Sequence, residues 1–96
     1  MDKFVPHYDL EKFKASDYDI TVTAYKDAFS MGFTYSDIDD VIAMMEHRHF
    51  YKSMTSYANH KVWQDVYHVP YDNMLIYIKF TEDEVSEFKL LSFKEK

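Results

Sequence analysis

The sequence predicts an α+β fold in which N-terminal helices pack on one face of a C-terminal antiparallel β-sheet. Residues 9–46 carry apolar side chains at helical spacing, whereas residues 62–95 hold three runs that alternate like β-strands. The connections between these runs are short, so neighbouring strands are expected to be antiparallel. Because the helices precede the strands instead of alternating with them, we expect the helices on one side of the sheet.

The chain has the length and composition of one domain. Its 96 residues are 47% hydrophobic, with nine Tyr and eight Phe but one Gly and two Pro. This content is enough for one core and leaves little sequence for linkers, so we expect residues 1–96 to form a single domain. The absence of Cys excludes disulfides and thiolate chemistry.

The first half of the chain predicts helices in a clear order. Asp9 is expected to cap a short helix that ends near Ala15. Residues 19–22 could form a brief strand or lead into the next helix. That helix is expected from about Thr23, and Gly32 stands where a left-handed residue ends a helix.

A further helix is predicted from Ser36. Apolar residues follow at positions i, i+3, i+4 and i+7 from Ile38 to Met45, and three Asp lie where negative charge favours the helix dipole. Residues 47–61 mix apolar residues with Ser, Thr and Asn, so an irregular or briefly helical connection is expected there.

Three strands are predicted at residues 62–69, 74–81 and 88–95, and the acidic segment 82–87 is expected to be a solvated turn. Side chains alternate along a strand, which divides each run into two sets. The set expected to face the helices is largely apolar: Trp63, Asp65, Tyr67, Val69, Met74, Ile76, Ile78, Phe80, Leu91 and Phe93. The set expected on the open face is more polar: Val62, Gln64, Val66, His68, Leu75, Tyr77, Lys79, Leu90, Ser92 and Lys94. Alone, this pattern favours an ordinary solvated face over a site.

Charge is unevenly distributed along the chain. The formal net charge is −6, which argues against a non-specific nucleic-acid binder. Between Glu46 and Asp65, however, there is no carboxylate, while Arg48, Lys52 and Lys61 lie there with three His. A local basic segment on an acidic body suits a small phosphate site better than a broad footprint.

Three stretches resemble the MqsR family of type II toxins. They are FYKSMTSYANHKVWQDVY at 50–67, IYIKF at 76–80 and SFKEK at 92–96, with weaker likeness at 6–7 and 31–42. The resemblance covers nearly the whole chain. It implies a RelE-like fold and a metal-independent, sequence-selective endoribonuclease that cuts single-stranded mRNA in the cytoplasm. It also implies a cognate antitoxin protein that neutralises the enzyme.

The resemblance implies four catalytic residues, which are Lys52, Gln64, Tyr77 and Lys94. The last three lie on the face that strand alternation alone leaves open, and this agreement makes a site the favoured interpretation. Cleavage without metal uses the 2′-hydroxyl as nucleophile and needs proton transfer and positive charge. We expect the two Lys to stabilise phosphorane charge, Tyr77 to transfer a proton or donate a hydrogen bond, and Gln64 to position the substrate.

Four further residues are candidates for RNA binding, namely His60, His68, Lys61 and Lys79. A family member has Arg where this chain has His68, and the segment before the last strand is longer and more acidic here. The spacing of the five His does not match a zinc site, so no metal and no cofactor are expected.

A second hypothesis belongs to a different class of protein. A toxin-derived chain without catalysis could bind a macromolecular partner through its acidic, Tyr-rich surface. Retention of all four implied catalytic residues favours the enzyme. The segment from Met1 to Leu10 does not resemble a signal peptide, and no apolar run reaches membrane-spanning length, so a cytoplasmic protein without membrane contact is expected.

Overall fold

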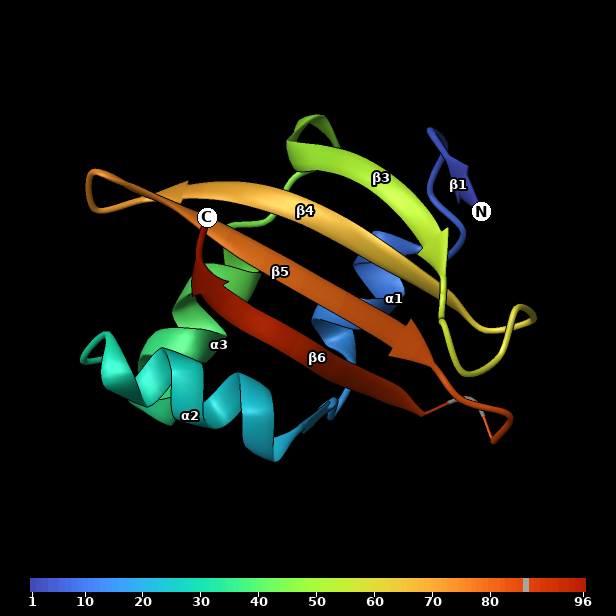
Figure 1. Cartoon of the computed structure of the whole chain (residues 1–96). Coiled ribbons are helices and arrows are strands. Elements are labelled where there is room, and N and C mark those ends of the chain that lie inside the picture. The colour runs from blue at the N-terminus through green and yellow to red at the C-terminus, as the bar shows by residue number, and fades with distance from the viewer. Residues whose placement is uncertain (86) are drawn as a thin grey trace.

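A computed structural model describes residues 1–85 and 87–96. They form three α-helices, one short 3-10 helix and six strands (Figure 1). In chain order these are β1 (Asp2–Lys3), α1 (Leu10–Ala15), β2 (Asp19–Ile20), α2 (Val22–Ser30), α3 (Tyr35–Ala43), η1 (His47–His49), β3 (Phe50–Thr55), β4 (Trp63–Tyr71), β5 (Met74–Glu82) and β6 (Phe88–Glu95). The predicted α+β class is confirmed.

The six strands form one sheet in the order β1-β3-β4-β5-β6-β2. Strands β4 to β6 form the predicted antiparallel meander, and β3, which was not predicted, extends it by one strand. The tight β4–β5 turn uses Asp72 and Asn73, both at positive φ, which suits a two-residue hairpin. Two-residue strands cover part of each edge: β1 is antiparallel to β3, and β2 is parallel to β6. The sheet is therefore not purely C-terminal or purely antiparallel.

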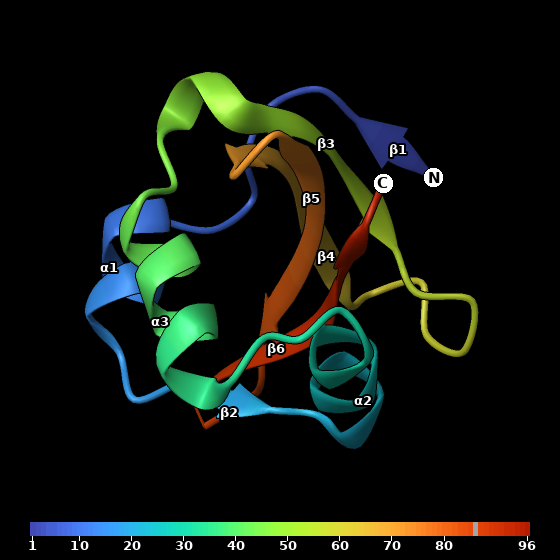
Figure 2. The same ribbon diagram turned by 90° about the vertical axis from the view of Figure 1, so that its left-hand side faces the viewer.

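The helices leave one face of the sheet open. In the side view, α1 and α3 lie across one face, while α2 lies beside β6 (Figure 2). The core between helices and sheet includes Phe13 of α1, whose ring stacks on Phe80 of β5 with centroids 3.9 Å apart. None of the helices in residues 1–85 and 87–96 is long and apolar enough to span a membrane.

The helix boundaries follow their local sequence signals. The Asp9 side chain accepts hydrogen bonds from the backbone N–H groups of the first turn of α1, as predicted. At α3, Thr34 and Asp37 form a reciprocal capping box, so the helix begins one residue before the predicted Ser36. Gly32, which follows the C-cap residue Met31 of α2, has φ +85°, and this confirms its predicted role in ending that helix.

The expectation of an irregular connection at residues 47–61 is wrong for its central part. A 3-10 turn, η1, leads into the strand β3, which pairs with both β1 and β4. The polar residues that suggested turns are accommodated by the fold. Ser53, for example, is fully buried and donates a 2.6 Å hydrogen bond to the carboxylate of Asp65. Pairing with β4 therefore overrides the local preference for turns.

One predicted side-chain assignment in the last strand is also wrong. Leu90, expected on the open face, is buried in the core, whereas Leu91 is only partly buried. The reason is a β-bulge: Phe80 pairs with Leu90 but Lys79 pairs with Ser92, which leaves Leu91 as an extra residue. Strict alternation fails across such an insertion.

The Asp65 carboxylate ties the N-terminal segment to the sheet. Although fully buried, it accepts hydrogen bonds from the backbone N–H groups of His7 and Tyr8, at 3.0 and 2.9 Å, as well as from Ser53. These donors satisfy the buried carboxylate.

The predicted turn at 82–87 precedes the last strand, and the structure describes it except for Ser86. The Asp83 side chain there accepts a hydrogen bond from the backbone N–H of Glu87.

Candidate functional site

Two adjacent rows of side chains cross the open face of the sheet. In the first row, strand pairing places Lys52 opposite Val66, Val66 opposite Lys79, and Lys79 opposite Ser92. Residues paired in this way have neighbouring side chains. Val66 is fully buried here yet lies outside the core cluster, as expected for a residue of this face that its neighbours cover.

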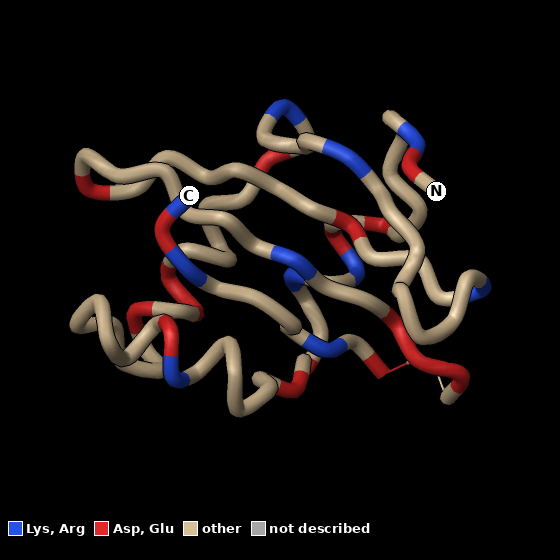
Figure 3. The backbone as a smooth tube through the Cα atoms, viewed as in Figure 1, with Lys and Arg blue, Asp and Glu red and all other residues tan. Residues whose placement is uncertain are grey.

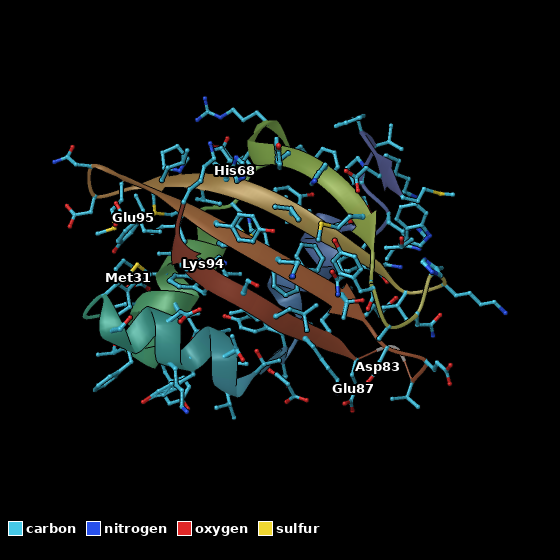
Figure 4. All side chains as sticks on the ribbon, viewed as in Figure 1. Met31, His68, Asp83, Glu87, Lys94 and Glu95 are labelled. Atoms are coloured by element: carbon cyan, nitrogen blue, oxygen red, sulfur yellow. The ribbon has the colours of Figure 1, made fainter. Side chains whose placement is uncertain are left out.

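The second row consists of His68 on β4, Tyr77 on β5 and Lys94 on β6. His68 pairs with Tyr77, and Tyr77 pairs with Lys94. Figure 4 labels His68 and Lys94, which lie on either side of β5. The Lys94 ammonium lies 5.3 Å from the centre of the Tyr77 ring. A cation at such a distance is attracted to the electron-rich face of an aromatic ring.

A β-bulge in β3 brings one more aromatic residue to this face. Phe50 pairs with Tyr67 but Lys52 pairs with Val66, so Tyr51 is an extra residue between them. The Tyr51 ring stacks on the His68 ring with centroids 4.3 Å apart. Strand alternation and family resemblance both missed Tyr51, although its position beside Lys52 in the basic segment was a signal that could have identified it.

Burial lowers the pKa of His68 and raises the pKa of its neighbour Tyr77. The pKa of His68 is lowered, chiefly because burial penalises its charged form and secondarily because of the charge on Lys96. The pKa of Tyr77 is raised by burial, although the nearby Lys52 charge opposes this shift. Near neutral pH, the second row therefore presents an uncharged imidazole beside an uncharged phenol.

Lys52 and Lys79 differ in their electrostatic surroundings. The Lys52 ammonium makes a 3.1 Å ion pair with the Asp2 carboxylate, and that hydrogen bond raises the pKa of Lys52. Lys79 lies in the middle of the sheet, where burial and then the Lys94 charge lower its pKa. Figure 3 shows Lys positions along β3, β5 and β6, whereas most acidic positions lie in turns and helices. The open face thus has locally positive charge on an acidic protein.

The other predicted site residues lie toward one end of these rows. Gln64 pairs with Met54 and lies two residues from Val66 on β4, hence on the same face. His60 and Lys52 both line a hollow of about 290 Å³ beside the N-terminus. Lys61 lies on the β3–β4 turn, where its backbone N–H donates to the Asn59 side chain. The structure therefore brings Lys52, His68, Tyr77, Lys79 and Lys94 closely together, leaves Gln64 next to them and places Lys61 outside the two rows.

The chain matches a known protein family over almost its whole length. Residues 5–95 match the family model described as "Motility quorum-sensing regulator, toxin of MqsA". This chain belongs to the MqsR toxin family. The mRNA interferase toxin MqsR of Escherichia coli strain K12 is similar to it, with 34% identity over 100 residues and full coverage of both chains. The resemblance to the MqsR family is thereby confirmed.

The range matched by the family model includes all four strands of the meander, and therefore every residue of the two rows on the open face. Within the described residues, no three His, Asp or Glu side chains are grouped so that they could hold a metal ion. The open face offers ammonium, phenol, imidazole, amide and hydroxyl groups.

Proposed function

We propose that this chain is an mRNA interferase, a metal-independent endoribonuclease that cuts single-stranded mRNA selectively by sequence. The observation that carries this proposal is the convergence of Lys52, His68, Tyr77 and Lys94, one from each strand of the meander, on the uncovered face. Two ammonium groups beside two uncharged proton-bearing rings form an arrangement suited to a phosphodiester.

The proposed reaction is an internal transfer at phosphorus. The ribose 2′-oxygen loses its proton and attacks the adjacent phosphorus, and the bond from phosphorus to the 5′-oxygen breaks. A proton is delivered to that leaving oxygen, so the products are a 2′,3′-cyclic phosphate and a 5′-hydroxyl end. Use of the 2′-hydroxyl as nucleophile makes the reaction specific to RNA.

We assign the site residues separate roles in stabilising charge, donating a proton, and holding the RNA. Lys52 and Lys94 stabilise the extra negative charge of the phosphorane, which an ammonium does best where water is partly excluded. Tyr77, kept protonated by its raised pKa, donates to a phosphate oxygen or to the leaving 5′-oxygen. Gln64 positions the RNA through its amide, while His60, His68, Lys61 and Lys79 contact the strand on either side.

The family description also suggests a partner. It names the family's members as toxins of MqsA. We propose that an antitoxin protein of that kind binds this chain and restrains its activity. Cleavage of mRNA would then take place in the cytoplasm, where the substrate and the antitoxin are both made.

The proposal is tested by incubating the purified protein with a long single-stranded RNA in EDTA. We expect discrete cuts with 5′-hydroxyl ends, a loss of about 100-fold or more in Lys52→Ala and Tyr77→Phe, and normal cleavage by Lys26→Ala. Lys26 is an exposed control on α2. Intact RNA after incubation with folded, antitoxin-free wild type would refute the enzyme and favour a non-catalytic binding protein.

A further inference from the structure

The Tyr51 side chain reaches the open face only because β3 is irregular. On a regular strand, alternation would send two consecutive residues to opposite faces. The bulge instead lets both Tyr51 and Lys52 project on the open side, while Phe50 before them packs against the core residue Tyr67. Bulges next to functional sites commonly re-aim a side chain in this way.

One face of the Tyr51 ring packs on His68, and much of the rest of the side chain is exposed to solvent. It stacks on His68 with an interplanar angle of 23°, and His68 in turn lies 5.8 Å from Tyr77. Nevertheless, 48% of Tyr51 remains exposed. A large aromatic residue at the rim of a charged site, held in place by a second ring, has an exposed π surface available to a ligand.

Two Lys ammonium groups lie near these rings. The Lys52 ammonium lies 5.6 Å from the centre of the Tyr51 ring, and the Lys94 ammonium lies 5.3 Å from that of Tyr77. Proteins that bind single-stranded nucleic acid combine positive charge along the backbone with aromatic rings on which bases stack. Both components occur here within adjacent residues.

We propose that Tyr51, resting on His68, is a stacking platform for one nucleobase of the bound RNA strand, next to the phosphate that Lys52 contacts. This inference rests on the proposed function. The buried His68 Nε2, which has no hydrogen-bond partner among the described residues, and the lowered pKa of His68 both favour an uncharged ring beneath Tyr51. Titratable or charged groups around this stack include Tyr51 and Lys52 on β3, Tyr77 on β5, Lys94 on β6, and Lys96.

The test uses a fluorescent single-stranded oligonucleotide of mixed sequence with 2′-O-methyl groups, which removes the nucleophile and prevents cleavage. We expect Tyr51→Ala and Tyr51→Leu to weaken binding about 5- to 100-fold, because both remove the aromatic face. Tyr51→Phe should bind within about twofold of wild type, since it keeps that face. The matched control is Tyr35→Ala on α3, where Tyr35 is 57% exposed and lies outside the open face.

The kinetics of cleavage of a long RNA give a second readout. A stacking platform predicts a higher KM for Tyr51→Leu in the same 5- to 100-fold range, roughly, with a smaller change in kcat. Unchanged affinity and KM in an active Tyr51→Leu protein would overturn the platform while leaving the proposed function intact. An equal loss in Tyr51→Phe and Tyr51→Leu would also overturn it, because the hydroxyl and not the ring would then be responsible. A wild type that neither cuts RNA nor binds the analogue would refute the proposed function and the platform with it.

Discussion

The two faces of the same sheet contrast in almost every property. On the covered face of β5, Ile76, Ile78 and Phe80 are fully buried under the helices. On the open face, the intervening Tyr77 and Lys79 are partly exposed and lie among cations. The backbone is shared, so the strand pairing serves both sets of side chains equally. The contrast indicates that stability depends mainly on the covered set of residues, and the proposed RNA chemistry uses the open set.

The largest expected effect tests the covered face. Phe13→Ala removes a fully buried ring that stacks on Phe80, and we expect a loss of about 3–5 kcal/mol in the free energy of unfolding. Urea denaturation followed by circular dichroism measures it. Phe29→Ala is the control, since Phe29 is 65% exposed and should change stability by less than about 0.5 kcal/mol. Equal losses in the two variants would contradict the described core.

The next effect tests the open face. Lys94→Ala is expected to lower kcat about 100- to 1000-fold through lost stabilisation of the transition state. Because Lys94 is exposed, its removal should alter the free energy of unfolding by less than about 1 kcal/mol. Lys12→Ala, an exposed change on α1, is the matched control for charge. A large loss of stability in Lys94→Ala would mean that the two faces are not separable.

Asp65 sharpens the comparison because it is a polar residue on the covered side. Asp65→Ala removes the shared acceptor of His7, Tyr8 and Ser53, and we expect a loss of about 2–3 kcal/mol in the free energy of unfolding. Thermal and urea unfolding both report it. Asp40→Ala, at an exposed position on α3, should remain within about 0.5 kcal/mol of wild type.

A smaller effect concerns the ion pair between Asp2 and Lys52. Asp2→Asn frees the Lys52 ammonium for phosphate, and we expect RNA affinity to rise by less than about fivefold. The gain should shrink as salt concentration increases, because the pair is partly exposed. Asp17→Asn, an exposed change elsewhere, should leave affinity unaltered. Weaker binding by Asp2→Asn would show that Asp2 supports Lys52 instead of competing with the RNA.

The last prediction concerns how the free energy of unfolding of the wild-type protein depends on pH. The pKa values of His7, His49 and His68 are all lowered, chiefly by burial. The unfolded chain therefore binds more protons than the folded one once pH falls below about 6.5, and the free energy of unfolding should decrease as pH falls from about 7 to 5.5. His68→Asn should reduce this slope in urea titrations. A slope unchanged by the substitution would exclude His68 as a contributor.

Much of the open face was predictable because strand alternation depends on residue spacing alone. Alternation assigns Gln64, His68, Tyr77, Lys79 and Lys94 to that face, and the strand register agrees. The catalytic roles of Lys52, Gln64, Tyr77 and Lys94 came from family resemblance and stay predictions. Lys52 could not be placed by alternation, because its strand was not predicted.

The sequence alone determined that helices precede the three C-terminal strands, that Asp9 caps α1 and Gly32 ends α2, and that the chain resembles the MqsR family. These depend on local periodicity and on residues close together in the chain. Only the tertiary structure decided that residues 50–55 form a strand, that Asp2 pairs with Lys52 and that Tyr51 rests on His68. Each of these features depends on which distant strands become neighbours and on where a bulge interrupts their pairing. These features are stabilised by contacts between segments that are distant in the sequence, and no local pattern of residues specifies such contacts.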